Sequence, residues 1–233
     1  MRISKPSGIA PIILWSFILC LAYWAYLFMT TTPLIVHDAI SYDDLGRTIH
    51  RDGGITFFKG GPQREPLYPL LVSIAMSLAD TFSMPYLQIQ KLLQIVILLV
   101  TQIASLHLLR KLGVKESLIA LAMLYIGFSP ALVNSALSLF SEIVAYPFIL
   151  GILFLIIKGW RSSLRDEPVG KIMVTGICLG LLFMAMISAK AIFEFVLPVA
   201  LLPFLFLTVY SLVKELGFLA ERIPLSARSP APY

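Results

Sequence analysis

Charged side chains are scarce in this sequence. They account for 13% of its 233 residues, whereas about a quarter of the residues in a soluble domain are charged. Hydrophobic residues reach 58%, and the mean hydropathy is +0.89. This balance excludes an ordinary soluble domain and indicates that lipid is the solvent for most of the chain.

The sequence also has few cysteines and no strong excess of positive charge. It contains 18 Lys and Arg against 13 Asp and Glu. In an apolar chain this bias is typical of the signals that orient membrane helices rather than of a nucleic-acid-binding surface. We therefore expect the lipid bilayer as a partner and no nucleic acid. The two cysteines, Cys20 and Cys178, lie inside apolar runs and are predicted to be small buried hydrophobes.

Long apolar runs are what the sequence has in abundance. Six of them approach the ~20 residues that a membrane core requires. The first follows Arg2 and Lys5 without a small-residue cleavage site, so we interpret it as an uncleaved membrane helix. A shorter apolar piece, 67–79, begins close to two prolines and is predicted to be an interfacial or re-entrant helix on the outer side. The six predicted spans are 9–29, 86–109, 116–133, 142–158, 171–188 and 191–212.

The basic residues give this arrangement an orientation. If both termini lie in the cytoplasm, most basic residues fall on the cytoplasmic side, as the positive-inside rule requires. The sequence thus predicts an all-α polytopic protein of the cell membrane, of the bacterial inner-membrane type. Residues 1–222 form its membrane domain, and the Pro- and Ser-rich tail 223–233 is predicted to be disordered. The cytoplasmic basic residues, 12 of the 18, are Arg2, Lys5, Arg110, Lys111, Lys115, Lys158, Arg161, Arg165, Lys171, Lys214, Arg222 and Arg228.

One connection, residues 31–66, is long and rich in charge, and long ordered loops are usually functional. Asp38, Tyr42, Leu45 and Ile49 follow one another at i, i+4, i+7 and i+11. This spacing predicts an external amphipathic helix over about 38–51 that lies on the membrane surface and ends at a Gly-Gly pair.

Asp38 is the unusual member of that stripe. A carboxylate on an otherwise apolar face is costly when it has no partner, and such a cost often marks a functional site. The alternative is that Asp38 caps the surface helix, because Asp is favoured in the first turn. The geometry of the sequence leaves both interpretations open.

Other ionisable residues are predicted on the same outer side. Lys59, Arg64 and Glu65 lie in a Gly- and Pro-rich segment before the interfacial helix, where cations suit a phosphate or simply contact lipid headgroups. Glu142 begins the fourth span, as a functional acid or as a partner of the helix dipole. Lys190 lies between the last two spans and is either functional or paired with Glu194 at i+4.

Together these residues resemble the GT-C superfamily of membrane glycosyltransferases, especially its ArnT-like and protein mannosyltransferase-like group. The pattern is Asp-x-x-x-Tyr-x-x-Leu, a Gly-Gly turn, a basic residue before Pro-Leu-Tyr-Pro, and a later Ser-Glu at the start of a span. The chain departs from it at Ala39 and Glu65, and family members usually continue through further spans. The matching residues are Asp38, Tyr42, Leu45, Gly53, Gly54, Arg64, Pro66, Leu67, Tyr68, Pro69, Ser141 and Glu142, with a weaker match at Lys190.

The resemblance implies a GT-C-like fold and transfer of a sugar from a polyprenyl-phosphate carrier to an acceptor hydroxyl, an activity of the cell envelope. It implies Asp38 as the general base and Glu142 as a second catalytic carboxylate, which orients the acceptor or binds a divalent metal. The substrate-binding residues would be Tyr42, Arg64, Glu65, Tyr68 and Lys190, with Arg64 and Lys190 on the phosphate.

A lipid-linked donor agrees with the lack of a Gly-rich nucleotide-binding fingerprint in the sequence. The alternative is a non-catalytic, split or truncated membrane module that binds the lipid carrier or serves as a scaffold. Such a module would need a partner chain that supplies the missing helices.

Overall fold

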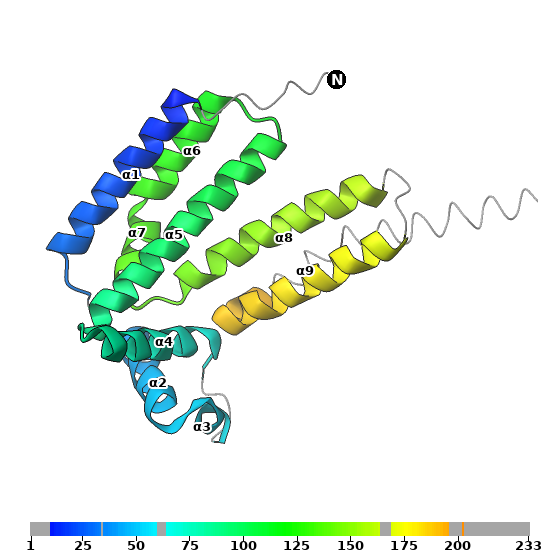
Figure 1. The fold of residues 1–233 in the computed structure, drawn as a ribbon. Helices are drawn as coiled ribbons and strands as arrows, with labels where there is room; N and C mark the ends of the chain where they lie inside the picture. Colours follow the sequence, from blue (N-terminus) through cyan, green and yellow to red (C-terminus); the bar gives the residue numbers. More distant parts are fainter. Residues whose placement is uncertain (1–9, 34, 60–63, 164–168, 196–201, 203–233) are drawn as a thin grey trace, which may run out of the picture. The chain divides into compact units, whose positions relative to one another are not determined.

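The computed structural model describes residues 10–33, 35–59, 64–163, 169–195 and 202 (Figure 1). Within these ranges every regular element is a helix, so the all-α prediction is confirmed. The chain divides into two units, Met1–Ala191 and Ile192–Tyr233. The α-helices described below belong to the first unit.

Among the residues that the structure describes, three helices are long and apolar enough to cross a membrane. They are α1 (Pro11–Thr30), α5 (Tyr86–Lys111) and α8 (Glu142–Ser163), whose apolar part is Glu142–Gly159. Each covers a span that the sequence predicts. Large apolar side chains point away from the protein along such helices, for example Trp15 and Leu19 on α1, as expected of surfaces that face lipid.

The predicted span 116–133 is not one continuous helix, which corrects the sequence prediction. It consists of α6 (Glu116–Phe128) and α7 (Pro130–Leu137), which are bent by 46°. The break follows from Pro130, because proline has no N–H to donate and disfavours the helical conformation in the residue before it. The bent pair counts as a fourth candidate span by length and composition.

The last two predicted spans are not confirmed as membrane spans within the described residues. Helix α9 (Val169–Ala189) covers 171–188, but the apolar part within the described residues, Met173–Ala189, is shorter than the other spans. A short 3-10 helix, η1 (Ala191–Phe195), follows it. The remainder of 191–212 and the tail 223–233 lie almost entirely outside the described residues.

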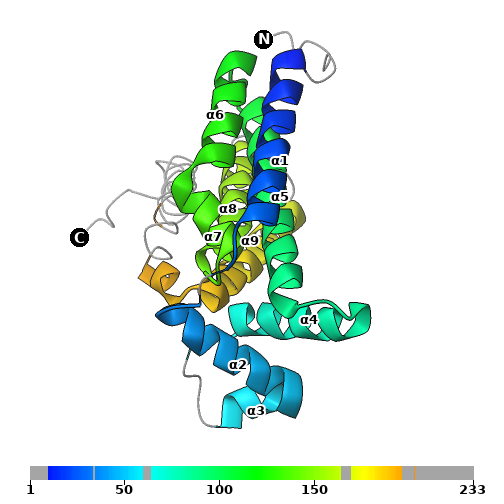
Figure 2. The same ribbon diagram turned by 90° about the vertical axis from the view of Figure 1, so that its left-hand side faces the viewer.

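The loop 31–66 and the segment after it form three short helices. The first, α2 (Asp38–Asp52), agrees with the predicted 38–51 and ends at Gly53, whose φ of 85° is a conformation that only glycine adopts readily. It is followed by α3 (Gly54–Lys59), which the sequence did not indicate, and by α4 (Leu67–Phe82). Helix α4 lies across the end of α5 (Figure 2) and packs on both α2 and α5.

The long helices pack through small and apolar side chains. Helix α1 packs along α6, where Ile13, Ile119 and Met123 form a buried cluster, and α8 packs on both α5 and α9. Cys20 is buried in the α1–α6 contact, as predicted. Cys178 is exposed on α9, so the prediction that both cysteines are buried is wrong for this one.

Candidate functional site

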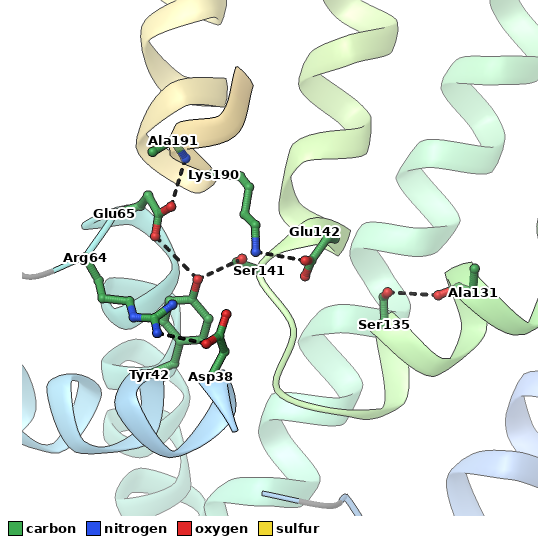
Figure 3. Close-up of polar contacts among 10 residues, drawn as sticks. All are labelled: Asp38, Tyr42, Arg64, Glu65, Ala131, Ser135, Ser141, Glu142, Lys190 and Ala191. Carbon is green, nitrogen blue, oxygen red and sulfur yellow. Dashed lines mark hydrogen bonds and ion pairs between the residues drawn. The ribbon is translucent and has the colours of Figure 1, made fainter. Parts of the chain in front are cut away.

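Asp38 is the first residue of α2, and its carboxylate is not unpaired. Arg64 Nη2 donates a hydrogen bond of 2.8 Å to Asp38 Oδ1 (Figure 3). The guanidinium also lies over the ring of Tyr42, 5.2 Å from the ring centre. The expectation that the charge of Asp38 has no partner is therefore wrong. Arg64, in the segment before α4, places its guanidinium group beside the start of α2.

This pairing fixes the charge state of Asp38. The hydrogen bond from Arg64 has the largest effect and lowers the pKa of the carboxyl group. Burial opposes it, and the nearby charges of Arg64, Lys190 and His37 lower the pKa further. Asp38 is therefore ionised at neutral pH. It can accept a proton, but less readily than an unpaired carboxylate would.

The alternative role of Asp38 as a helix cap finds no contact in the structure. Asp38 is inside the helix, His37 is the N-cap residue, and no side-chain capping hydrogen bond is present at this end. His37 has a φ of 53°, which is strained for any residue other than glycine or asparagine. The backbone at the entry to α2 thus stores strain directly beside Asp38.

A second ion pair joins α8 to the end of α9. Lys190 Nζ donates to Glu142 Oε1 at 2.8 Å (Figure 3). Burial lowers the pKa of Lys190, but its hydrogen bond to Glu142 and the electrostatic effect of Glu142, Tyr42 and Glu65 outweigh burial, so its pKa lies above the ordinary value. The alternative pairing of Lys190 with Glu194 is replaced by this longer-range contact. Glu142 Oε2 is buried without a hydrogen-bond partner.

Tyr42 connects the two ion pairs. Its hydroxyl group lies 3.1 Å from Ser141 Oγ, next to Glu142, and 3.4 Å from Glu65 Oε2. The other oxygen of Glu65 accepts a hydrogen bond of 2.9 Å from the backbone N–H of Ala191. Tyr42 and Glu65 therefore bind α2, the start of α8 and the end of α9 to one another.

Tyr68 lies behind Tyr42 rather than beside the ion pairs. Their rings meet edge to face with centres 4.9 Å apart, and Tyr68 is fully buried. Gln90 donates to its hydroxyl group at 3.5 Å. In this arrangement Tyr68 supports Tyr42, and the substrate contact predicted for it would need a movement of Tyr42.

The structure thus brings six of the seven predicted site residues into one cluster, with Tyr68 directly beneath. Lys59 is exposed at the end of α3 and is not part of it. The cluster carries three carboxylates, of Asp38, Glu65 and Glu142, and two cations, of Arg64 and Lys190. Its formal charge is therefore −1 when all five groups are ionised.

Comparison of the chain with protein-family models, with curated proteins and with solved structures gives no match. What the site can do therefore follows from its own chemistry. The two cations of the cluster, each paired with a carboxylate, are groups that suit an anionic oxygen group, and the carboxylates can accept a proton or a hydroxyl hydrogen bond.

A divalent metal does not fit this arrangement. Glu142 Oε1 already accepts a hydrogen bond from the ammonium group of Lys190. Among the residues that the structure describes, no group of three or more His, Cys, Asp or Glu side chains is placed to hold a metal ion.

Sequence reasoning missed the residues that hold α2 in place. Asp43 is a buried residue of α2. It accepts hydrogen bonds from Tyr86 Oη at 2.5 Å and from Arg47 Nε at 3.0 Å. Gly46 lies so close to α4 that a Cβ atom would come within 2.5 Å of Val72 Cγ1. Neither position lies on the apolar stripe, so the periodicity of the sequence gave no sign that either residue is buried.

Proposed function

We propose that this chain is the membrane part of a glycosyltransferase that takes a sugar from a polyprenyl-phosphate carrier and passes it to an acceptor hydroxyl group. The proposal rests on two ion pairs, one between Asp38 and Arg64 and the other between Glu142 and Lys190. Tyr42 connects the two. These residues come from four distant parts of the sequence, and a purely structural role would not need two cations at one place.

The proposed reaction requires little from the protein beyond these groups. The bond between the sugar C1 and the phosphate oxygen breaks, a bond forms between C1 and the acceptor oxygen, and the acceptor proton passes to a carboxylate. The leaving group is a phosphate monoester, which is stable as an anion with a second pKa of about 6, so no strong general acid is needed. Arg64 and Lys190 would hold the phosphate, and Asp38 would take the proton.

The proposed setting is the cell membrane, with both termini in the cytoplasm and loop 31–66 on the opposite side. The apolar faces of α1, α5 and α8 support a membrane location. The bias of basic residues in the sequence supports the orientation. A partner chain that adds further helices is compatible with the proposal.

Sugar transfer by the full chain tests the proposal. Membranes that contain the wild type or Asp38→Asn are supplied with radiolabelled polyprenyl-phosphate hexoses and pentoses, and release of polyprenyl phosphate is measured. Because a general base contributes ~10² to 10⁴ in rate, we expect Asp38→Asn to lose that much activity. The control is Asp44→Asn, which removes one charge from an exposed position of the same helix. A wild type that transfers none of these sugars, alone or with neighbouring gene products, would reject the proposal.

One observation favours a second candidate, a module that binds the lipid carrier without catalysis. The hydrogen bond from Arg64 lowers the pKa of Asp38, and a weaker base is a poorer catalyst. Tight binding of a polyprenyl phosphate by a wild-type chain that never transfers sugar would support this candidate.

A further inference from the structure

Both cations of the cluster are already occupied by carboxylates of the same protein. Arg64 binds Asp38, and Lys190 binds Glu142, each at 2.8 Å. With Glu65 included, the formal charge of the cluster is −1. An incoming phosphate therefore meets no cation that is ready for it, and meets three like charges that repel it.

The two ion pairs are accessible enough to open. The exposed fractions of the side chains are 30% for Arg64 and 49% for Asp38, and 20% for Lys190 and 39% for Glu142. Pairs at such exposure contribute little to stability, because water solvates the separated charges well. They can therefore exchange partners without disrupting the packing of α2, α8 and α9.

The second pair is also incomplete. Glu142 holds Lys190 through Oε1 alone, while Oε2 is buried with no hydrogen-bond donor. A buried carboxylate oxygen without a donor is costly. A ligand that carried a hydroxyl group toward Glu142 would satisfy this oxygen, so the present arrangement is better suited to a bound state than to the empty one.

We propose that Asp38 and Glu142 each bind one of the two cations while the site has no ligand. A phosphate group then binds by replacing Asp38 as the partner of Arg64 and Glu142 as the partner of Lys190. The carboxylates thus compete with the phosphate for the same cations. This inference deepens the proposed function, on which it rests for the identity of the phosphate as part of a lipid carrier.

The exchange has a consequence for the order of events. While Arg64 binds Asp38, the carboxylate is a weak base. Once the phosphate takes the guanidinium group, Asp38 loses its main stabilising partner and accepts a proton more readily. Binding of the phosphate therefore prepares the base, and proton acceptance before the donor is bound is disfavoured.

Binding measurements on the full chain in detergent test the exchange. Isothermal titration uses farnesyl phosphate, with farnesol as the uncharged control for the apolar tail and inorganic phosphate as the control for the headgroup. Competition predicts that neutralising a carboxylate tightens binding. The free energy of an exposed ion pair corresponds to a change of at most a few-fold in affinity. We therefore expect Asp38→Asn and Glu142→Gln each to bind farnesyl phosphate about two- to fivefold more tightly than the wild type.

The matched control is Asp44→Asn, which removes the same charge from α2 at an exposed position outside the cluster. It should change the affinity by less than either cluster variant, because solvent screens distant exposed charges. Arg64→Gln should weaken binding by about tenfold or more, since it removes a charged hydrogen-bond donor. Thermal melting of each variant shows whether it is folded. If Asp38→Asn does not fold, Glu142→Gln tests the same competition at the other pair.

The outcomes separate the exchange from the proposed function. Tighter binding by Asp38→Asn and Glu142→Gln, but not by Asp44→Asn, supports the exchange even if no sugar is ever transferred. If inorganic phosphate shows the same pattern and affinity as farnesyl phosphate, the exchange holds for a free anion. Binding by Asp38→Asn and Glu142→Gln that is unchanged, weaker, or no tighter than that of Asp44→Asn overturns the exchange, whatever the transfer assay shows. A wild type that binds neither phosphate also overturns it.

Discussion

The hydroxyl group of Tyr86 donates a hydrogen bond of 2.5 Å to the buried carboxylate of Asp43, and this contact joins the first turn of α5 to the middle of α2. Arg47 donates to the other oxygen of the same carboxylate at 3.0 Å. Asp38 lies on the same helix about one turn earlier. The position of Asp38 relative to the long helices therefore depends on Asp43.

A double-mutant cycle between Asp43→Asn and Tyr86→Phe should reveal this coupling. We expect a coupling free energy of about 1 to 2 kcal/mol, because the hydrogen bond is formed with a buried carboxyl acceptor. Thermal or denaturant unfolding of the four proteins provides the measurement. Strictly additive effects of the two substitutions would show that the contact does not hold α2 on α5.

Gly46→Ala should separate α2 from α4. A Cβ atom at this position would lie 2.5 Å from Val72 Cγ1 and 2.8 Å from Val72 Cβ, so the helices must move apart, at a cost of about 1 to 3 kcal/mol. The control is Gly54→Ala, where a Cβ atom would meet nothing within 4 Å. Melting temperatures of the two variants provide the comparison, and equal values would contradict the close approach of the helices.

Lys91→Met should destabilise the end of α1. The ammonium group is buried in α5 and donates to the carbonyl oxygens of Phe28 at 2.7 Å and Thr31 at 2.6 Å. Its removal leaves helix-terminal carbonyl groups without a donor, which we expect to cost about 2 to 3 kcal/mol. Lys115→Met is the control, since Lys115 is exposed. A Lys91→Met variant as stable as this control would show that the contact is dispensable.

The ion pair of Asp38 should make stability depend on pH in one direction. Its folded pKa is lowered, so the stabilising contribution is present above the unfolded value of about 3.9 and is lost as the pH falls below it. Asp38→Asn should therefore lower the melting temperature at pH 7, by the equivalent of at most about 1 kcal/mol because the pair is partly exposed. The difference from the wild type should shrink progressively as the pH falls below the unfolded pKa and through the folded pKa. A difference that grows on acidification would contradict the assigned pairing.

Cysteine labelling should place loop 31–66 and the α5–α6 connection on opposite sides of the membrane. Asp44→Cys and Lys115→Cys both introduce thiols at exposed positions, in a background with Cys20 and Cys178 replaced by Ala. An impermeant maleimide added to intact cells should label position 44 and reach position 115 only after the membrane is opened. The reverse pattern would invert the orientation that the basic residues predict.

The boundaries of α2 could be predicted from the sequence because two local signals agree there. Helical spacing of the apolar residues sets its length, and Gly53 ends it. The partner of Asp38 could not be predicted in this way. Arg64 is 26 residues away along the chain, so its contact with Asp38 depends on the tertiary fold and not on local spacing.

Burial of Asp43 escaped prediction for a related reason. Its position falls outside the apolar stripe, so periodicity assigns it to solvent, while its partner Tyr86 is 43 residues away. The break at Pro130 differs, because its signal is in the sequence itself. The sequence prediction followed the mostly apolar residues of 116–133 and gave no weight to Pro130, whose missing N–H interrupts the helix.

That break also bears on the order in which the protein can be assembled. It leaves the carbonyl group of Gly127 at the end of α6, and the donor that satisfies this oxygen is the indole N–H of Trp24 on α1, at 2.8 Å. In lipid no water can take that place. During synthesis α1 emerges first and α6 about a hundred residues later, a separation of 103 residues between donor and acceptor. The first helix must therefore stay available beside the site of insertion until α6 arrives, and a truncated nascent chain that ends before α6 is expected to leave the indole group of Trp24 without its acceptor.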